Sequence, residues 1–294
     1  MTLETKHKDG EIMEYVTLSN GVEMPVLGYG TFMISNEETK RCVLDAIDVG
    51  YRSIDTAQAY YNEEGVGNAI EICGIPREEL FLTTKIWIEN AGYEKAKKSI
   101  DESLKKLKTE YIDLLLIHQA FNDYYGTWRA MEEAYKEGKV KAIGVSNFYA
   151  DRFYDLASFS EIKPMVNQLE THVFQQQKHI RKYLNTYGTR IEAWAPFAKG
   201  EKNLFKHPLL TEIGAKYQKS AGQIALRYLI QSDVVVIPKS SHKERMQENL
   251  NVFDFKLTVE ELQKISNLDE AENIFMDHED VEQIENFFSR FNIK

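Results

Sequence analysis

The chain has 294 residues, of which 43% are hydrophobic and 28% are charged, a composition typical of a globular protein. Its net charge of -10, from 46 acidic against 36 basic residues, disfavours general binding to nucleic acids or anionic membranes. The apolar runs are too short to cross a bilayer, and residues 1–15 lack the apolar core of a secretory signal, so we expect a cytoplasmic protein.

The first predicted element is a β-hairpin at about residues 14–27, EYVTLSNGVEMPVL. Two strand-like runs flank Asn20 and Gly21, and an Asn-Gly pair is the strongest short signal for a tight hairpin turn. The hairpin precedes every other element, and we expect it to close the bottom of the domain.

Strand-like and helix-like segments then alternate along the chain. The eight strand candidates are VLGYGTF (26–32), YRSIDTA (51–57), LFLTTKI (80–86), IDLLLIH (112–118), KAIGVSN (141–147), MVNQLE (165–170), RIEAWAP (190–196) and VVVIPKS (234–240). Eight strands alternating with helices, several with polar C-terminal ends, favour an α/β fold of the (β/α)8 TIM barrel type. No linker interrupts the chain, so we expect one domain, with the barrel at about 28–269 and a tail at 270–294.

Stretches with apolar residues at helical spacing lie between the strands, for example at 37–50, 93–108, 127–138 and 176–188. Several of them end at a glycine (Gly50, Gly138 or Gly188), as helices often do. The two cysteines, Cys42 and Cys73, fall in helix-like stretches, and we expect both to be buried in the core without a disulfide framework.

A glycine-rich turn of the Rossmann type is not convincing anywhere in the chain. GYGTFM (28–33) has only the first two glycines of G-x-G-x-x-G, and GVGNAI (65–70) lacks the third glycine and does not follow a strand. A nucleotide cofactor would therefore have to bind to loops at the barrel mouth.

Four ionisable residues, Asp55, Tyr60, Lys85 and His118, lie at or just beyond the ends of strand candidates. In a parallel barrel these ends open onto one face, where catalytic residues gather. A lysine ammonium lowers the pKa of a nearby tyrosine from its usual value of about 10, and an acid beside the lysine keeps it charged. A histidine can orient a carbonyl oxygen or relay a proton. This set predicts carbonyl reduction or its reverse.

Each of these residues has a structural interpretation when it is taken alone. Asp55 can cap a helix or bond to a loop, Lys85 can be a solvated strand end, and His118 can be a hydrogen-bonded core residue. Tyr60 is one of 16 tyrosines. Their shared placement at the ends of successive strands favours catalysis.

The chain resembles the aldo-keto reductases from about Asn20 to Asp269. The motifs that carry the resemblance are GYRSIDTAQAYYNEEGVGNAI (50–70), TTKIW (83–87), DLLLIH (113–118), GVSNF (144–148), NQLETH (167–172), AWAP (193–196) and IPKSSHKERMQENL (237–250). Among its members, the chain resembles bacterial-type reductases such as the 2,5-diketo-D-gluconate reductases. The resemblance implies NADPH-dependent reduction of aldehydes and ketones to alcohols.

The resemblance also implies a role for each residue of the tetrad. Tyr60 would donate a proton to the carbonyl oxygen while the nicotinamide delivers hydride to the carbon. Lys85, paired with Asp55, would tune Tyr60, and His118 would orient the carbonyl. We find no cluster with metal-ligand spacing and expect no metal.

A set of residues is implied to bind NADPH: Gly30, Thr31, Asp55, Ser146, Asn147, Gln168, Trp194, Lys239, Ser240, Ser241, Arg245, Glu248 and Asn249. Within this set, residues 146, 147 and 168 would hold the nicotinamide carboxamide, and residue 194 would stack on its ring. Residues 239–241 and 245 would bind the adenosine 2′-phosphate, and residues 248 and 249 would contact adenine. The two cations favour NADPH over NADH, and use of both cofactors remains an alternative.

Phe32, Trp87 and His118 are implied to contact the substrate. Many members have tryptophan where this chain has Phe32, and tryptophan and proline where it has HQAF (118–121). Since the connection after His118 and the tail after Asp269 are short, we expect an open pocket for small carbonyl compounds and keto-sugar acids.

Two other functions remain as alternatives. A regulatory NADPH-binding module of the same fold with slow turnover is disfavoured because no long N-terminal extension is seen. A barrel isomerase or hydrolase would need a metal cluster or a phosphate loop, and HEDVEQIENF (278–287) is predicted to be a solvated helix. We expect a small-molecule carbonyl substrate, no nucleic-acid or membrane partner, and a monomer, with a weak homodimer as the alternative.

Overall fold

The computed structural model describes residues 4–8 and 11–293, and the side chains of residues 13–293. A single parallel sheet follows the order of the chain through β4 (Tyr29–Gly30), β5 (Ser53–Asp55), β6 (Phe81–Ile86), β7 (Leu114–Ile117), β8 (Ile143–Ser146), β9 (Val166–Glu170), β10 (Arg190–Trp194) and β11 (Val234–Val236). A parallel bridge from Leu27 to Val236 joins the two edges. The amide of Gly28 donates to the carbonyl oxygen of Val236 at 2.8 Å. The sheet thereby closes into the predicted (β/α)8 barrel.

All eight strand predictions are confirmed, although the strands are shorter than the apolar runs that predicted them. Polar residues fall at their C-terminal ends, as expected: Asp55 ends β5 and Ser146 ends β8. Ser146, Gln168 and Glu192 are register partners on β8, β9 and β10. Because register partners on parallel strands share a face, these three polar side chains point to the same side of the sheet.

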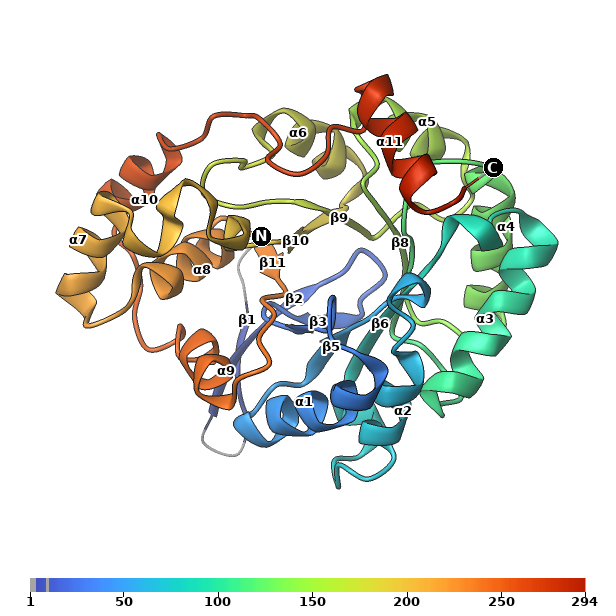
Figure 1. Cartoon of the computed structure of the whole chain (residues 1–294), viewed down its shortest axis with the longest axis horizontal. Coiled ribbons are helices and arrows are strands. Elements are labelled where there is room, and N and C mark those ends of the chain that lie inside the picture. The colour runs from blue at the N-terminus through green and yellow to red at the C-terminus, as the bar shows by residue number, and fades with distance from the viewer. Residues whose placement is uncertain (1–3, 9–10, 294) are drawn as a thin grey trace.

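Helices surround the strands (Figure 1). They are α1 (Asn36–Val49), α2 (Glu63–Ile70), α3 (Tyr93–Leu107), α4 (Tyr124–Lys136), α5 (Ala150–Phe159), α6 (Lys178–Tyr187), α7 (Pro208–Tyr217), α8 (Ala221–Gln231), α9 (Lys243–Leu250), α10 (Val259–Ser266) and α11 (Val281–Arg290). The predicted glycine ends are confirmed, since Gly50 and Gly188 cap α1 and α6 with φ of 120° and 69°. Gly138 follows α4 with φ of 77°.

The cysteine prediction is correct for one residue of the two. Cys42 lies buried in α1, but Cys73 is only half-buried and lies in the turn beyond α2. α2 ends at Ile70, and Gly74, with a φ of 75°, and Pro76 keep the chain from continuing as a helix beyond the turn. Both thiols are free.

A three-stranded antiparallel sheet of β1 (Glu4–Lys8), β2 (Glu11–Thr17) and β3 (Glu23–Pro25) precedes the barrel. The predicted hairpin is the β2–β3 pair, with Gly21 at a φ of 88°, whereas β1 was not predicted. The side-chain amide of Asn20 donates to the carbonyl oxygen of Lys141 at 2.9 Å, just before β8 begins. The hairpin therefore covers the N-terminal ends of the barrel strands, which confirms its predicted place at the bottom.

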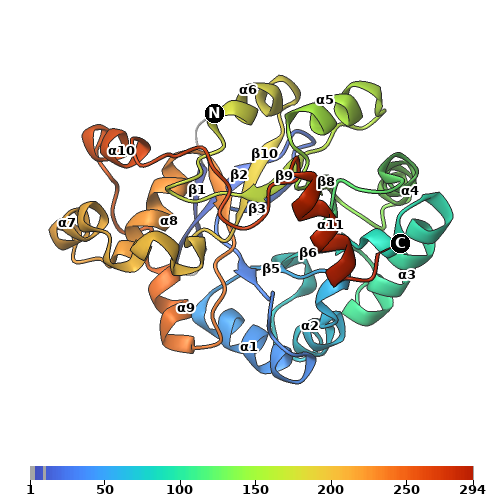
Figure 2. The ribbon, with the colours of Figure 1, turned by 45° about the horizontal axis from the view of Figure 1, so that its top comes forward.

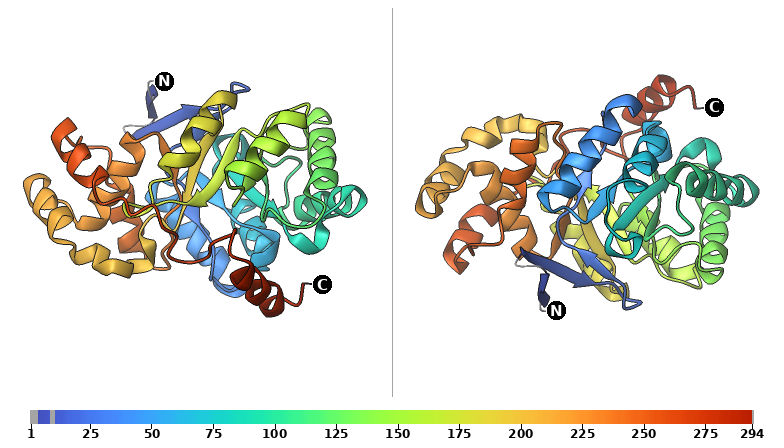
Figure 3. Two further views of the ribbon diagram at one scale, coloured as in Figure 1. Left: turned by 90° about the horizontal axis from the view of Figure 1, so that it is seen from above. Right: turned by 90° about the horizontal axis from the view of Figure 1, so that it is seen from below.

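The C-terminal segment lies at the other end of the barrel. Figure 2 shows α11 over the barrel, and both views in Figure 3 place it opposite the β1–β3 sheet. Within residues 4–8 and 11–293, no helix combines the length and apolarity needed to span a bilayer.

Candidate active site

The four predicted strand-end residues converge at the mouth of the barrel. Lys85, at 0% exposure, points its Nζ at Asp55 Oδ1 at 2.6 Å. The same ammonium donates to the carbonyl oxygen of Thr56 at 3.0 Å and lies 3.3 Å from Tyr60 Oη. Tyr60 ends a short 3-10 helix, η1 (Gln58–Tyr60), which carries its phenol from the end of β5 to the lysine on β6.

Burial and charge act in opposite directions on Tyr60. Burial raises the pKa of Tyr60 above its ordinary value of 10, and the Lys85 ammonium lowers it by a smaller amount. The predicted lowering by the lysine is present, but the net shift in the pKa of Tyr60 is upward, so the prediction of a lowered pKa is wrong. Burial lowers the pKa of Lys85, but the neighbouring acidic groups, Asp55 first among them, together raise it above its ordinary value. The side chains are therefore a neutral phenol and a charged ammonium at neutral pH.

His118 lies beside the phenol on the same face. Its ring contacts Tyr60 edge-on, with centroids 5.6 Å apart, and Trp87 at 5.1 Å. Burial, followed by the charge of Lys85, lowers the pKa of His118 well below 6.5, so the imidazole is neutral. Its Nδ1 is buried and receives no hydrogen bond from the part of the chain that the structure describes.

A second polar group lies next to the tetrad, on β8 to β10. Gln168 Nε2 donates to Asp55 Oδ2 at 2.9 Å, which ties this group to the tetrad. Ser146 Oγ bonds to the carbonyl oxygen of Gln168 at 3.0 Å. Asn147 has a φ of 61°, a left-handed conformation that asparagine tolerates better than most residues, and its Oδ1 accepts from Trp194 Nε1 at 2.9 Å. The four residues implied to hold the nicotinamide are thus assembled in one network.

The first barrel strand closes this network from the other side. Thr31 donates to the carbonyl oxygen of Asp55 through both its amide and its hydroxyl, each at 3.0 Å. At Gly30, an added Cβ would lie 3.1 Å from the carbonyl oxygen of Ile237. Any larger residue here would have to push the Ile237 carbonyl aside by a few tenths of an ångström, so glycine suits the close approach of the segment after β11 to β4.

The segment after β11 carries the predicted phosphate residues. Lys239 and Arg245 are exposed, and neither forms an ion pair with any residue that the structure describes. Arg245 lies in the first turn of α9, where free backbone amides favour an anion. Of the remaining four positions, three are less open and Glu248 is exposed. Ser240 and Asn249 are buried, Ser241 is half-buried, and Glu248 accepts from Ser220 at 2.5 Å.

Aromatic side chains surround the phenol of Tyr60. Phe32, 48% exposed, packs on Tyr60 with ring centroids 5.0 Å apart. Trp87 is buried under the C-terminal segment, with Phe287 at 6.0 Å and Phe291 at 5.4 Å from its ring. The sequence predicted an open pocket next to a short tail. At Trp87 this prediction is wrong, because the tail covers that side of the pocket. The prediction of a solvated helix at 278–287 is also wrong, because one face of α11 packs on Trp87 and Phe121.

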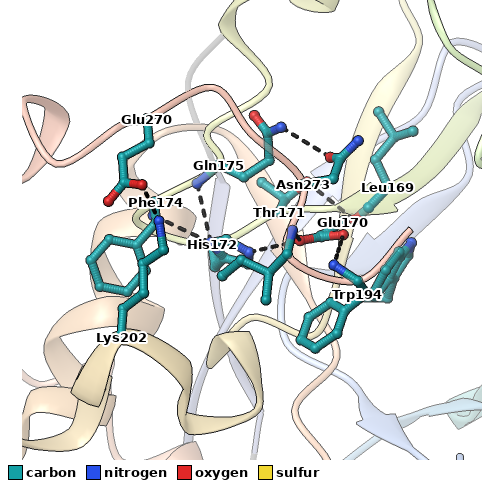
Figure 4. Close-up of polar contacts among 12 residues, drawn as sticks. Leu169, Glu170, Thr171, His172, Phe174, Gln175, Trp194, Lys202, Glu270 and Asn273 are labelled. Atoms are coloured by element: carbon teal, nitrogen blue, oxygen red, sulfur yellow. Dashed lines mark hydrogen bonds and ion pairs between the residues drawn. The ribbon is translucent and has the colours of Figure 1, made fainter. Parts of the chain in front are cut away.

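The tail is anchored to the barrel before it reaches α11 (Figure 4). The buried carboxylate of Glu170, at the end of β9, accepts from the backbone amides of Ile274 at 2.6 Å and Phe275 at 3.3 Å. His172 Nε2 lies 3.1 Å from the same carboxylate, and Phe275 packs on Trp194 at 5.7 Å. The tail thus contacts both tryptophans that the resemblance places in the site, Trp194 at the cofactor and Trp87 at the substrate.

Sequence reasoning missed three parts of this site. Two of them are the buried carboxyl groups of Glu170 and Glu192. A charged residue inside an otherwise strand-like run of the sequence could have indicated each one. The tail was missed although Ile284, Phe287 and Phe288 are spaced to share a helix face.

Comparison with known proteins identifies the family. The family model described as "Aldo/keto reductase family" matches residues 26–270. Glyoxal reductase of Bacillus subtilis (strain 168) is 46% identical over 265 residues, covering 90% of this chain and 95% of that protein. Methylglyoxal reductase DkgA of Escherichia coli (strain K12) is 40% identical over 262 residues, covering 88% and 94%.

Solved structures agree with this assignment. The crystal structure of an aldo-keto reductase from Bombyx mori in complex with NADP is 36% identical, with a TM-score of 0.85, and the match covers 91% of this chain and 96% of that one. The shared barrel, the match over nearly the whole barrel sequence and the convergent tetrad agree. The chain belongs to the aldo/keto reductase family.

Proposed function

We propose that this protein is an NADPH-dependent reductase of small aldehydes and ketones, with Tyr60 as the proton donor. The observation that carries the proposal is the position of Lys85. Its ammonium lies 2.6 Å from Asp55 and 3.3 Å from the phenol oxygen of Tyr60. A fixed positive charge at that distance stabilises the phenolate that remains after the proton leaves.

The protonation states suit reduction in the forward direction. The raised pKa of Tyr60, caused first by burial, keeps the phenol protonated at neutral pH. An alkoxide is more basic than a phenolate, so the phenol can still protonate the oxygen of a carbonyl group that is being reduced. His118 is neutral and can donate one ring N–H to the same oxygen, which orients the carbonyl without adding a positive charge.

The residues fit NADPH because two cations are left without ion-pair partners among the described residues. NADPH, when bound, supplies the hydride for the carbonyl carbon. The unpaired cations Lys239 and Arg245 would hold its 2′-phosphate, and Arg245 also lies at the start of a helix. Ser146, Asn147 and Gln168 would hold the carboxamide, with Trp194 against the ring. The Bombyx mori relative has been crystallised with NADP, which supports this cofactor.

Glyoxal and methylglyoxal are the substrates that we propose first, because relatives named for their reduction are 46% and 40% identical. The aromatic rings of Phe32 and Trp87 form a small apolar wall on either side of Tyr60 and His118. Keto-sugar acids would need a cation for their carboxylate. The Lys199 ammonium, 5.9 Å from the Phe32 ring, is placed to supply one.

The test is NADPH consumption at 340 nm with glyoxal, methylglyoxal and a keto-sugar acid as separate substrates. We expect turnover with the two dicarbonyl compounds at neutral pH, and weaker turnover with the acid. No consumption with any carbonyl compound, despite tight NADPH binding, would favour the slow regulatory module and refute the proposal.

A further inference from the structure

Glu192 is a buried carboxyl group next to the tetrad. It lies in the middle of β10 at 0% exposure, on the face that it shares with Gln168. Its Oε2 accepts from Gln168 Nε2 at 2.8 Å. Its Oε1 is buried and has no hydrogen-bond partner in the described part of the chain. Burying a carboxyl group with one bare oxygen is costly, so a purely structural residue is a poor explanation for it.

The amide of Gln168 connects Glu192 to the tetrad. Its nitrogen carries two hydrogens, one directed at Asp55 Oδ2 at 2.9 Å and the other at Glu192 Oε2 at 2.8 Å. A flipped amide would turn its oxygen toward the carboxylate of Asp55, which repels it, and would remove the donor that Glu192 Oε2 now has. Glu192 and Asp55 together therefore fix the nitrogen inward, and no residue that the structure describes donates to the amide oxygen of Gln168.

Charge balance determines the state of Glu192. The Lys85 ammonium already pairs with Asp55, so a second carboxylate here would be a buried negative charge without its own partner. Burial, and then the nearby Asp55, raise the pKa of Glu192 to about 8, with Gln168 and Lys85 opposing this. At neutral pH Glu192 is accordingly protonated. When it ionises, its charge raises the pKa of Tyr60 and makes the phenol a weaker acid.

We propose that Glu192 is a positioning residue that acts through Gln168, holding its amide so that the oxygen is left for the carboxamide of the nicotinamide. The inference rests on the proposed function, because it assigns the partner of the Gln168 oxygen to NADPH. A second consequence follows from the proximity of Glu192 to the tetrad: its ionisation opposes proton donation by Tyr60.

A double-mutant cycle on NADPH affinity tests the positioning role. We expect Glu192→Met, which keeps the volume but removes the acceptor, to weaken NADPH binding about tenfold in calorimetric titration, the loss of about one hydrogen bond. Glu192→Gln retains an acceptor oxygen and should stay within about twofold. In a Gln168→Met background, Glu192→Met should cause no further loss, since there is no amide left to orient.

Three results separate the outcomes. An equal loss from Glu192→Met in both backgrounds, or no loss in either, overturns the inference while leaving the proposed function intact. Absence of NADPH binding by the unaltered protein overturns the proposed function and the inference together. Weakening that is confined to the background with Gln168 supports the inference.

A pH profile provides a second readout that does not depend on the folding of Glu192→Met. In the unaltered protein we expect kcat for methylglyoxal reduction to fall several-fold as pH rises through the pKa of Glu192 at about 8. Glu192→Gln cannot ionise, so its kcat should hold to about pH 9. The groups that face Glu192 are Asp55, Lys85, Gln168 and Tyr60, and all are unchanged in this variant. An identical alkaline fall in both proteins contradicts the inference.

Discussion

The Lys85 ammonium has no exposed surface, so its positive charge needs the carboxylate of Asp55 as a buried partner. Removing one partner of a buried ion pair leaves an uncompensated charge and costs about 3 to 5 kcal/mol of stability. Asp55 therefore contributes to stability as well as to the proposed chemistry. Both of its carboxylate oxygens are engaged, Oδ1 by Lys85 and Oδ2 by Gln168, which fixes the ammonium beneath the phenol of Tyr60.

The residues proposed to bind the 2′-phosphate differ from the tetrad, because the cations Lys239 and Arg245 are exposed and have no ion-pair partners among the described residues. We expect Lys239→Ala combined with Arg245→Ala to weaken NADPH binding about 100-fold, because two charge-assisted contacts are lost. Binding of NADH, which lacks the 2′-phosphate, should change by less than about threefold. Calorimetric titration of both cofactors provides the measurement, and Lys243→Ala, whose lysine pairs with Asp48, is the matched control. Equal weakening of both cofactors would remove the 2′-phosphate assignment.

The tail and α11 decide which side of the site is closed. Glu170 holds the tail at Ile274 and Phe275, and α11 then lays Phe287 and Phe291 on Trp87. No residue of α11 is fully buried, and the helix covers Trp87 and Phe121 with half-buried apolar side chains. The family match ends at residue 270, so this cover is built from chain outside the matched region.

Loss of this cover should affect the substrate more than the cofactor. We expect Phe287→Ala with Phe291→Ala to raise the KM for an aromatic aldehyde such as benzaldehyde by roughly threefold to tenfold, because aromatic contacts at Trp87 are lost. NADPH affinity should be unchanged, because the residues proposed to bind its 2′-phosphate lie on α9 and in the segment before it, and not on α11. Steady-state kinetics provide the measurement, with Phe159→Ala, a 79% exposed phenylalanine on α5, as the control. A KM equal to that of the control protein would show that α11 does not form a pocket wall.

At the scale of the whole molecule, closure of the barrel brings together residues far apart in the chain. Asp55, Lys85, Gln168 and Glu192 lie on β5, β6, β9 and β10, yet one chain of hydrogen bonds joins them. The alternation of strands and helices predicts a closed barrel. The polar residues at the strand ends predict that the active site lies at the mouth of this barrel. The tetrad could therefore be predicted from the sequence.

The remaining parts of the site depend on information that no local pattern carries. In a strand as short as RIEAW, both faces are largely buried, so alternation does not show that Glu192 points toward Gln168. The raised pKa of Tyr60 follows from burial, which the sequence does not quantify. The place of α11 depends on a long-range anchor, the carboxylate of Glu170, which lies more than 100 positions before the amides that it accepts.

We propose that the phenol of Tyr60, set against Lys85, donates the proton that completes carbonyl reduction. Tyr60→Phe isolates this role, because the substitution removes one oxygen and keeps the ring that packs on Phe32 and His118. We expect kcat for methylglyoxal to fall by at least about 1,000-fold, while the calorimetric Kd for NADPH stays within about threefold. Turnover by Tyr60→Phe that matches the unaltered protein would contradict the account.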